Sequence, residues 1–162
     1  MKKSVLAATT VAVAAAAGTG SMASPGRTAG WYSRLRKPPY QPPGAVFPVV
    51  WTTLYGDIAA ASAVAIDRFR ADGRNDAARR YVAGLCANLI INAGWSWLFF
   101  RYHRLGASAL GAAVLAASSA DLVRRTAQAD PRAGLALSPY PLWCAFATVL
   151  STHIWQLNRR GE

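Results

Sequence analysis

Residues 31–55 read WYSRLRKPPYQPPGAVFPVVWTTLY, and they carry the strongest structural signal in the chain. The stretch combines five prolines and three cationic side chains with closely spaced aromatic residues. From Phe47 onward its composition is that of an apolar helix, in whose first turn a proline is tolerated. The pairs Pro38-Pro39 and Pro42-Pro43 oppose a regular helix and favour extended or turn geometry. The sequence therefore predicts a stiff, basic, aromatic collar at the mouth of an apolar helix.

The placement of charge separates the possible classes of basic protein. The chain has 162 residues, 53% of them apolar, and a formal net charge of +11. Such a balance fits a nucleic-acid binder, a membrane-surface protein or a membrane protein with basic loops. A nucleic-acid binder would interleave its cations with its helices. Here Lys and Arg are absent from five windows, at residues 4–24, 47–66, 81–100, 105–123 and 135–158.

Each window is about 20 residues long, enough for a helix to cross about 30 Å of hydrocarbon. We therefore predict an all-α protein: a single domain over residues 1–162 that forms a five-helix transmembrane bundle in the lipid bilayer. No nucleic-acid partner is expected. The predicted connections are a Pro-rich loop at 25–46, a solvated basic loop at 67–80, a tight turn at 101–104 and a link at 124–134.

The first window permits two interpretations. Lys2 and Lys3, the apolar run 5–17 and the small residues Ser21 and Ala23 follow the order of a cleavable signal peptide. The window is also long enough to span, and we favour a retained helix because cleavage would leave too few helices for the bundle. Orientation stays open, since loops on the N-terminal side hold ten Lys and Arg residues and the opposite loops hold eight.

Polar and aromatic residues recur on single faces of three windows. Amides that faced lipid would lack hydrogen-bond partners, so the face that carries Asn88 and Asn92 should point inward. Two plainer alternatives stay open: the asparagines only bridge helices, and the tryptophans near helix ends only anchor the protein at the interface. The three faces are Asn88, Asn92, Trp95 and Phe99; Trp51, Tyr55, Ile58 and Ser62; and Trp143, Ala147, Leu150 and Ile154.

Asp57 lies near the middle of the second window without a basic residue in any window to pair with it. A carboxylate at this depth is a candidate functional group. We expect the alternative, a neutral Asp57 that is hydrogen-bonded to a neighbouring helix, because burial favours the protonated form. Cys86 and Cys144 are expected to be buried and inert, and His103 and His153 have no second ligand at metal spacing, so no metal site is predicted.

Three segments together resemble the TspO/translocator-protein family, the tryptophan-rich sensory proteins and peripheral benzodiazepine receptors, in its bacterial form. Residues 31–56 are similar to the family pattern W-Y-x-x-L-x-K-P-x-[WY]-x-P-P followed by P-[VI]-W-x-x-L-Y. NLIINAGWSWLFF at 88–100 and PYPLWCAFATVL at 139–150 resemble two further family motifs. The three segments cover the first loop and three of the five predicted helices.

The resemblance implies a five-helix membrane bundle, commonly a homodimer, that binds porphyrins and benzodiazepine-type ligands under the first loop. The collar would be a lid whose aromatic rings stack on a flat ligand, while Arg34, Arg36 or Lys37 attracts porphyrin carboxylates. A porphyrin would be the ligand, and no separate cofactor is implied. Matched by motif, the ligand-binding residues would be Tyr32, Trp51, Asn88, Asn92, Trp95, Trp143 and Ala147.

Two functions follow from this resemblance. The protein would act as a sensor, regulator or transporter of tetrapyrroles, or as an enzyme that promotes light- and oxygen-dependent breakdown of protoporphyrin, with Trp51 and Trp143 as redox-active neighbours. A third reading is a structural membrane protein whose tryptophans only anchor it. Sterol binding through the motif of animal members is not expected, because Thr152, His153 and Gln156 stand where that motif needs tyrosine and a basic residue.

Overall fold

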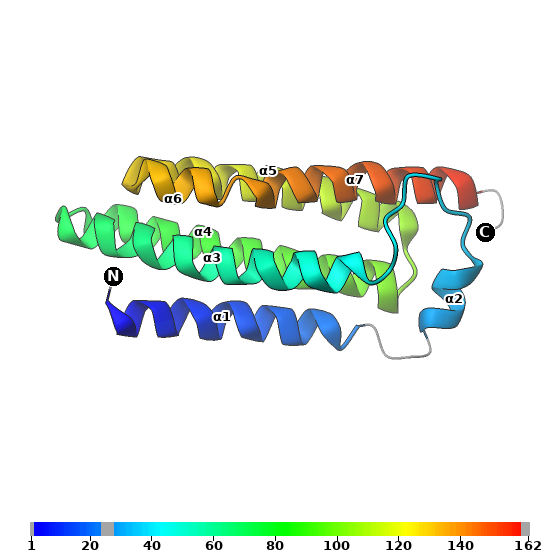
Figure 1. Ribbon diagram of the computed structural model, residues 1–162, viewed down its shortest axis with the longest axis horizontal. Coiled ribbons are helices and arrows are strands. Elements are labelled where there is room, and N and C mark those ends of the chain that lie inside the picture. Colours follow the sequence, from blue (N-terminus) through cyan, green and yellow to red (C-terminus); the bar gives the residue numbers. More distant parts are fainter. Residues whose placement is uncertain (1, 24–27, 160–162) are drawn as a thin grey trace.

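The structure is a computed structural model that describes residues 2–23 and 28–159, and every regular element in these ranges is a helix (Figure 1). Five helical segments are long and apolar enough to cross a membrane, which confirms the predicted all-α bundle and a multi-pass integral membrane protein. The elements are α1 Lys3–Ser21, α2 Thr28–Arg34, α3 Val46–Ala71, α4 Asn75–Ser96, the π-helix η1 Trp97–Arg101, α5 Leu105–Ala129, α6 Pro131–Ala136 and α7 Pro139–Asn158.

The long helices run along one axis, with the start of α1 and the end of α7 at opposite ends, as five passes require (Figure 1). The first window forms the helix α1, which packs against α3. Thr9 donates from Oγ1 to the Ala59 carbonyl at 2.9 Å, and Val5 and Val13 are buried in the core. At its other end, Trp97 donates from Nε1 to the Thr19 carbonyl at 3.0 Å.

Two of the predicted loops are largely helical. The basic loop predicted at 67–80 reduces to a turn at 72–74, where Gly73 adopts a φ of 70°. The prediction was wrong because arginine is a good helix former and a helix continues past the hydrocarbon into the headgroup region. With 26 residues, α3 is about 39 Å long, which exceeds the roughly 30 Å of the apolar layer.

The link predicted at 124–134 was also wrong, since α5 continues to Ala129 and α6 follows at once. Asp130 caps α6 by accepting hydrogen bonds from the Arg132 and Ala133 amides at 3.0 Å each. The bond from Ala133 is the main cause of a pKa for Asp130 below its ordinary value. The chain then breaks before Pro139, which cannot donate to the preceding helix and begins α7 instead.

The Pro-rich loop 25–46 contains a short helix that the sequence reasoning did not predict. α2 ends at Arg34, before the four prolines at 38–43 that oppose helix, so the prediction of a non-helical loop holds only for its second half. Residues 24–27 lie outside the described part of the chain. The segment after α2 crosses the end of the bundle where α7 ends and leads into α3 (Figure 1). We call residues 28–45 the lid.

The π-helix η1 ends α4 beneath the lid. The Tyr102 amide donates to the Trp97 carbonyl at 2.9 Å, five residues back, and His103 follows with a φ of 55°. Such wider turns are rare and frequently occur at functional sites. Here the turn places Phe99 and Phe100 against α2, where both contact the ring of Tyr32 at centroid distances of 5.9 and 6.1 Å.

Candidate functional site

A chain of buried and half-buried hydrogen bonds crosses the centre of the bundle. Tyr140 on α7 donates to Asn88 Oδ1 at 2.8 Å and accepts from Asn92 Nδ2 at 3.1 Å. The Tyr55 hydroxyl on α3 donates to Asn92 Oδ1 at 3.0 Å. Asn88 Nδ2 in turn donates to Ser118 Oγ on α5 at 3.1 Å. Four helices are therefore tied together by one connected set of side chains, which we call the polar centre.

The predicted inward orientation of the two asparagines is confirmed, because Asn88 is 0% exposed and Asn92 is 1% exposed. Both amides bridge helices, as the plainer alternative expected, and their contact with a ligand stays a prediction. Sequence reasoning missed Tyr140, whose hydroxyl joins the two. Its position opposite the Asn88–Asn92 face could have been anticipated only by knowing which helices are neighbours.

Aromatic rings lie in contact between the polar centre and the lid. Trp51 on α3 contacts Trp95 on α4 at a centroid distance of 6.4 Å and contacts Tyr140 at 6.5 Å. Trp95 stacks on Phe99 at 5.8 Å, and Phe99 meets Tyr32 of the lid. This series of contacts leads from the polar centre to α2, and three of its members are predicted ligand-binding residues.

A second aromatic group lies on α7. Trp143 contacts Phe146 at 5.3 Å and Phe47, at the start of α3, at 5.8 Å. Phe146 continues to Tyr40 of the lid at 6.4 Å. Ala147, one turn beyond Trp143, is half-buried. The structure thus brings Trp51 and Trp95 into direct contact and places Trp143 in the neighbouring group.

Two indole N–H groups distinguish this region from the polar centre. Nε1 of Trp95 and Nε1 of Trp143 are buried and have no hydrogen-bond partner among the described residues. An unpaired buried donor costs about 1–3 kcal/mol, so each such group in a folded protein requires an explanation. Gln41 Oε1, in the lid, is buried and unpaired in the same way. An acceptor-bearing ligand beneath the lid would satisfy the indoles.

The lid is held to the end of α7 by specific bonds. Asn158 accepts from the Arg36 amide at 3.0 Å and donates to the Arg36 carbonyl at 2.9 Å. The Tyr40 hydroxyl and His153 Nδ1 lie 3.0 Å apart. His153 therefore takes part in packing between the lid and α7, as expected from its position on the last predicted helix.

The lid itself carries three cationic side chains. Arg34 and Arg36 are exposed, and the Lys37 ammonium lies 4.4 Å from the centre of the Tyr32 ring, a cation–π contact. Burial raises the pKa of the Tyr32 hydroxyl above its ordinary value. The expected solvated His103 is exposed, and its ring also stacks on Trp31 at 3.9 Å.

The predictions for Asp57 and for the two cysteines have mixed outcomes. Asp57 is half-buried and makes no hydrogen bond or ion pair with any residue the structure describes, so the predicted bond to a neighbouring helix is wrong. Cys144 is buried as expected, whereas Cys86 is exposed on the bundle surface, where lipid rather than protein would cover it. Within the described ranges, no three His, Cys, Asp or Glu residues gather into a metal-binding group.

Comparison with known proteins gives a consistent result. A model of the TspO/MBR family matches residues 7–156. The chain is 33% identical over 151 residues to protein CrtK of Rhodobacter capsulatus, covering 91% of this chain and 89% of that protein. It is 31% identical over 147 residues to the tryptophan-rich sensory protein of Cereibacter sphaeroides, covering 91% and 87%. It is 29% identical over 129 residues to the translocator protein of Ovis aries, covering 80% and 75%.

Proposed function

The chain belongs to the TspO/MBR family, and on that premise we propose that it binds a porphyrin or related tetrapyrrole in the aromatic region beneath the lid. Membership supports, in broad terms, a membrane sensor or transporter role related to tetrapyrroles or sterols. The proposal narrows this role to tetrapyrroles. The protein would then sense them, regulate their use or move them within the membrane.

The observation that carries the proposal is the pair of unpaired indole donors, Trp95 Nε1 and Trp143 Nε1. Both lie in aromatic groups that connect to the lid, so a flat ligand would gain stacking and hydrogen bonds together. The lid adds cations at Arg34, Arg36 and Lys37, which suit the propionate carboxylates of a porphyrin. The aromatic surfaces and the cations together favour a planar, anionic ligand over a sterol.

A homodimer is part of the proposal and rests on the family resemblance alone. Ser108 and Ala112, two small residues of α5, are fully or almost fully buried within one chain, at 0% and 1% exposure. Their small size therefore serves packing inside the bundle, and the dimer would use another surface. Light scattering on the detergent-solubilised protein measures the molar mass and decides between monomer and dimer.

An enzymatic role is the second candidate. Trp51 contacts Trp95, Tyr55 and Tyr140, with centroid distances of 6.4, 5.5 and 6.5 Å. These adjacent, oxidisable rings would lie beside a bound porphyrin and could exchange electrons with it when light excites it in the presence of oxygen. If this role is correct, illumination of the complex in air degrades protoporphyrin, and Trp51→Phe retains affinity but slows the degradation.

Quenching of tryptophan fluorescence by protoporphyrin measures the affinity directly. Loss of one stacking indole removes about 0.5–1.5 kcal/mol beyond the lost contact area, so Trp51→Ala and Trp143→Ala should each weaken binding by at least about 2–10-fold. Trp97→Phe is the matched control, because the Trp97 indole is bonded to Thr19 on the α1 side of the bundle. Wild-type affinity in both alanine variants would refute binding beneath the lid and leave these tryptophans as interfacial anchors.

A further inference from the structure

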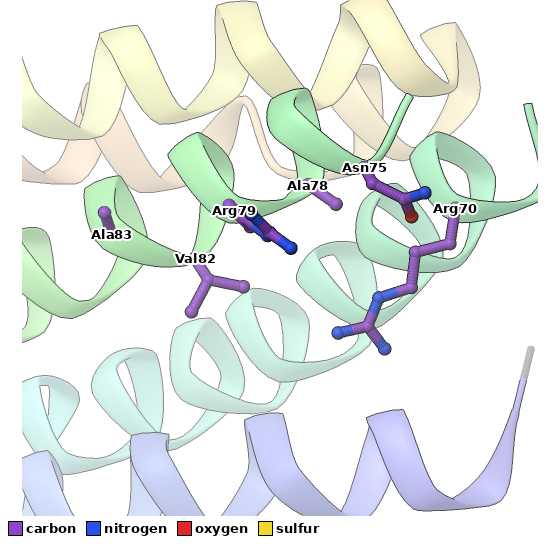
Figure 2. Close-up of a pocket in the computed structure, with 6 residues that line it drawn as sticks. All are labelled: Arg70, Asn75, Ala78, Arg79, Val82 and Ala83. Atoms are coloured by element: carbon purple, nitrogen blue, oxygen red, sulfur yellow. The ribbon is translucent and has the colours of Figure 1, made fainter. Parts of the chain in front are cut away.

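Two cavities open at the end of the bundle away from the lid, between α1, α3 and α4. One, of about 510 Å³, is lined by Arg70, Asn75, Ala78, Arg79, Val82 and Ala83 (Figure 2). The other, of about 360 Å³, continues along α1 and α4. Arg70 and Val82 belong to the walls of both, so the two cavities form one surface groove, which we call the α1–α4 groove.

The two ends of the α1–α4 groove differ in polarity. At one end the side chains of Arg70, from α3, and Arg79, from α4, extend toward the same opening (Figure 2). The remainder is lined mainly by small and apolar side chains, among them Ala8, Ala12, Ile66, Leu85 and Cys86. The groove thus joins a cationic mouth to an apolar channel on the lipid-facing surface.

The position of the arginines along the helices places this mouth at the membrane boundary. Arg70 lies four residues beyond the charge-free window 47–66, which is about 6 Å along the helix. Arg79 lies two residues before the window 81–100. Both guanidinium groups therefore reach the level of lipid headgroups, while the channel lies at the level of acyl chains.

The charges at the mouth are available to an anion. Arg70 has no ion pair with any residue in the described ranges. Arg79 lies 3.9 Å from Asp76, but both side chains are more than 80% exposed, and such a pair is worth little. The nearby Asp67 accepts from the Lys2 amide, so its carboxylate is already engaged.

We propose that the α1–α4 groove binds one anionic phospholipid of the surrounding bilayer. Arg70 and Arg79 would hold its phosphate, since guanidinium groups pair with phosphate through two parallel hydrogen bonds. One acyl chain lies in the channel between α1 and α4. The lipid binds on the lipid-facing surface of the bundle, at the end opposite the lid. This site is therefore independent of the proposed tetrapyrrole region.

The charge at the mouth selects among lipids. Phosphatidylcholine carries a compensating cation on its headgroup and gains little from two further cations, whereas phosphatidylglycerol has a net negative charge. A second copy of the chain seated in the groove would instead exclude lipid from it. A preference for phosphatidylglycerol over phosphatidylcholine therefore distinguishes the proposed lipid site from unselective apolar binding and from a dimer interface.

Native mass spectrometry of the detergent-solubilised protein, titrated with dioleoyl phosphatidylglycerol or dioleoyl phosphatidylcholine, measures bound lipid directly. We expect one tightly bound phosphatidylglycerol per chain. The Arg70→Gln/Arg79→Gln variant should weaken it by about tenfold or more and leave phosphatidylcholine unchanged. Arg80→Gln/Arg132→Gln is the matched control, because it removes equal charge at the same end of the bundle from positions that do not line the cavities.

The apolar part of the groove is tested separately. Ala8→Phe adds a ring to the channel and should lower phosphatidylglycerol binding severalfold although both arginines are present. Unchanged binding in this variant, or in the arginine variant, would overturn the proposal, as would equal binding of the two lipids by the wild type. All variants alter surface residues, and circular dichroism verifies that each is folded.

Discussion

At the centre of the bundle the hydroxyl of Tyr140 bonds to two asparagine amides, whereas toward the lid the buried indole N–H groups of Trp95 and Trp143 have no partner among the described residues. Both regions are built from α3, α4 and α7, and both contain buried polar groups. In the polar centre the side chains satisfy one another. Beneath the lid they leave donors unpaired.

This difference in hydrogen bonding indicates that residues close together in one motif have separate roles, such as Asn92 and Trp95, or Tyr140 and Trp143. A hydrogen bond made within the fold contributes to stability, and removing one partner leaves the other unsatisfied. A buried donor without a partner destabilises the ligand-free protein. That free-energy cost is removed when a ligand supplies an acceptor. We therefore expect mutations in the polar centre to alter mainly stability, and mutations beneath the lid to alter mainly affinity.

The largest effect should come from Tyr140→Phe. The substitution keeps the ring but removes the hydroxyl, which leaves Asn88 Oδ1 and Asn92 Nδ2 each without this partner. Each group left unpaired costs about 1–3 kcal/mol. Thermal unfolding followed by circular dichroism should show a clear loss of stability. Tyr102→Phe is the control, since Tyr102 is 61% exposed, and an equal loss in both variants would contradict a structural role for the polar centre.

The complementary test removes the unpaired donors. Trp95→Phe and Trp143→Phe keep a ring and lose the N–H, so the unfolding midpoint should fall less than in Tyr140→Phe. Protoporphyrin affinity should fall about 2–10-fold, the equivalent of one hydrogen bond of about 0.5–1.5 kcal/mol. Fluorescence quenching measures it. Stability losses as large as that of Tyr140→Phe, with unchanged affinity, would show that both regions serve the fold alone.

The spanning helices and the inward-facing asparagines could be predicted from the sequence. Charge-free windows of the right length are enough to locate spanning helices, because a bilayer excludes Lys and Arg from its core. The inward direction of Asn88 and Asn92 followed from the same physics, since lipid offers amides no partners. These are properties of one helix and its solvent, and the structure bears them out.

Features that depend on neighbouring elements could not be predicted in this way. The bond partner Tyr140 depends on which helix faces α4, and the unpaired indoles depend on the packing around them. The helical continuation through Arg68 and Arg70 was missed because charge was taken to mean loop, although both residues extend α3 beyond the apolar layer. The π-helix at Trp97–Arg101 has no periodic signal in five residues.

A smaller effect should follow from releasing the lid. Asn158→Ala removes both bonds to the Arg36 backbone while leaving the aromatic contacts beneath the lid. The free energy that exposed hydrogen bonds of this kind contribute lies at the low end of about 0.5–1.5 kcal/mol. Because the lid is then held less firmly over the ligand, protoporphyrin should dissociate about threefold faster. Stopped-flow fluorescence measures the rate. Gln156→Ala, an exposed neighbour on α7, should behave as the wild type, and equal rates in both variants would mean that these bonds do not hold the lid closed.

The smallest effect should come from Tyr40→Phe, which separates the two ways in which Tyr40 fastens the lid. The variant loses the bond between the hydroxyl and His153 Nδ1 but keeps the ring contact with Phe146. Tyr40 is 44% exposed, so water replaces much of that bond, and the dissociation rate should rise by less than about twofold. Tyr40→Ala also loses the ring, and it should release the ligand faster than Tyr40→Phe because aromatic contacts contribute about 0.5–1.5 kcal/mol beyond buried area. Equal rates in the two variants would assign the fastening to the hydroxyl alone and would remove the aromatic contact with α7 from the account of the lid.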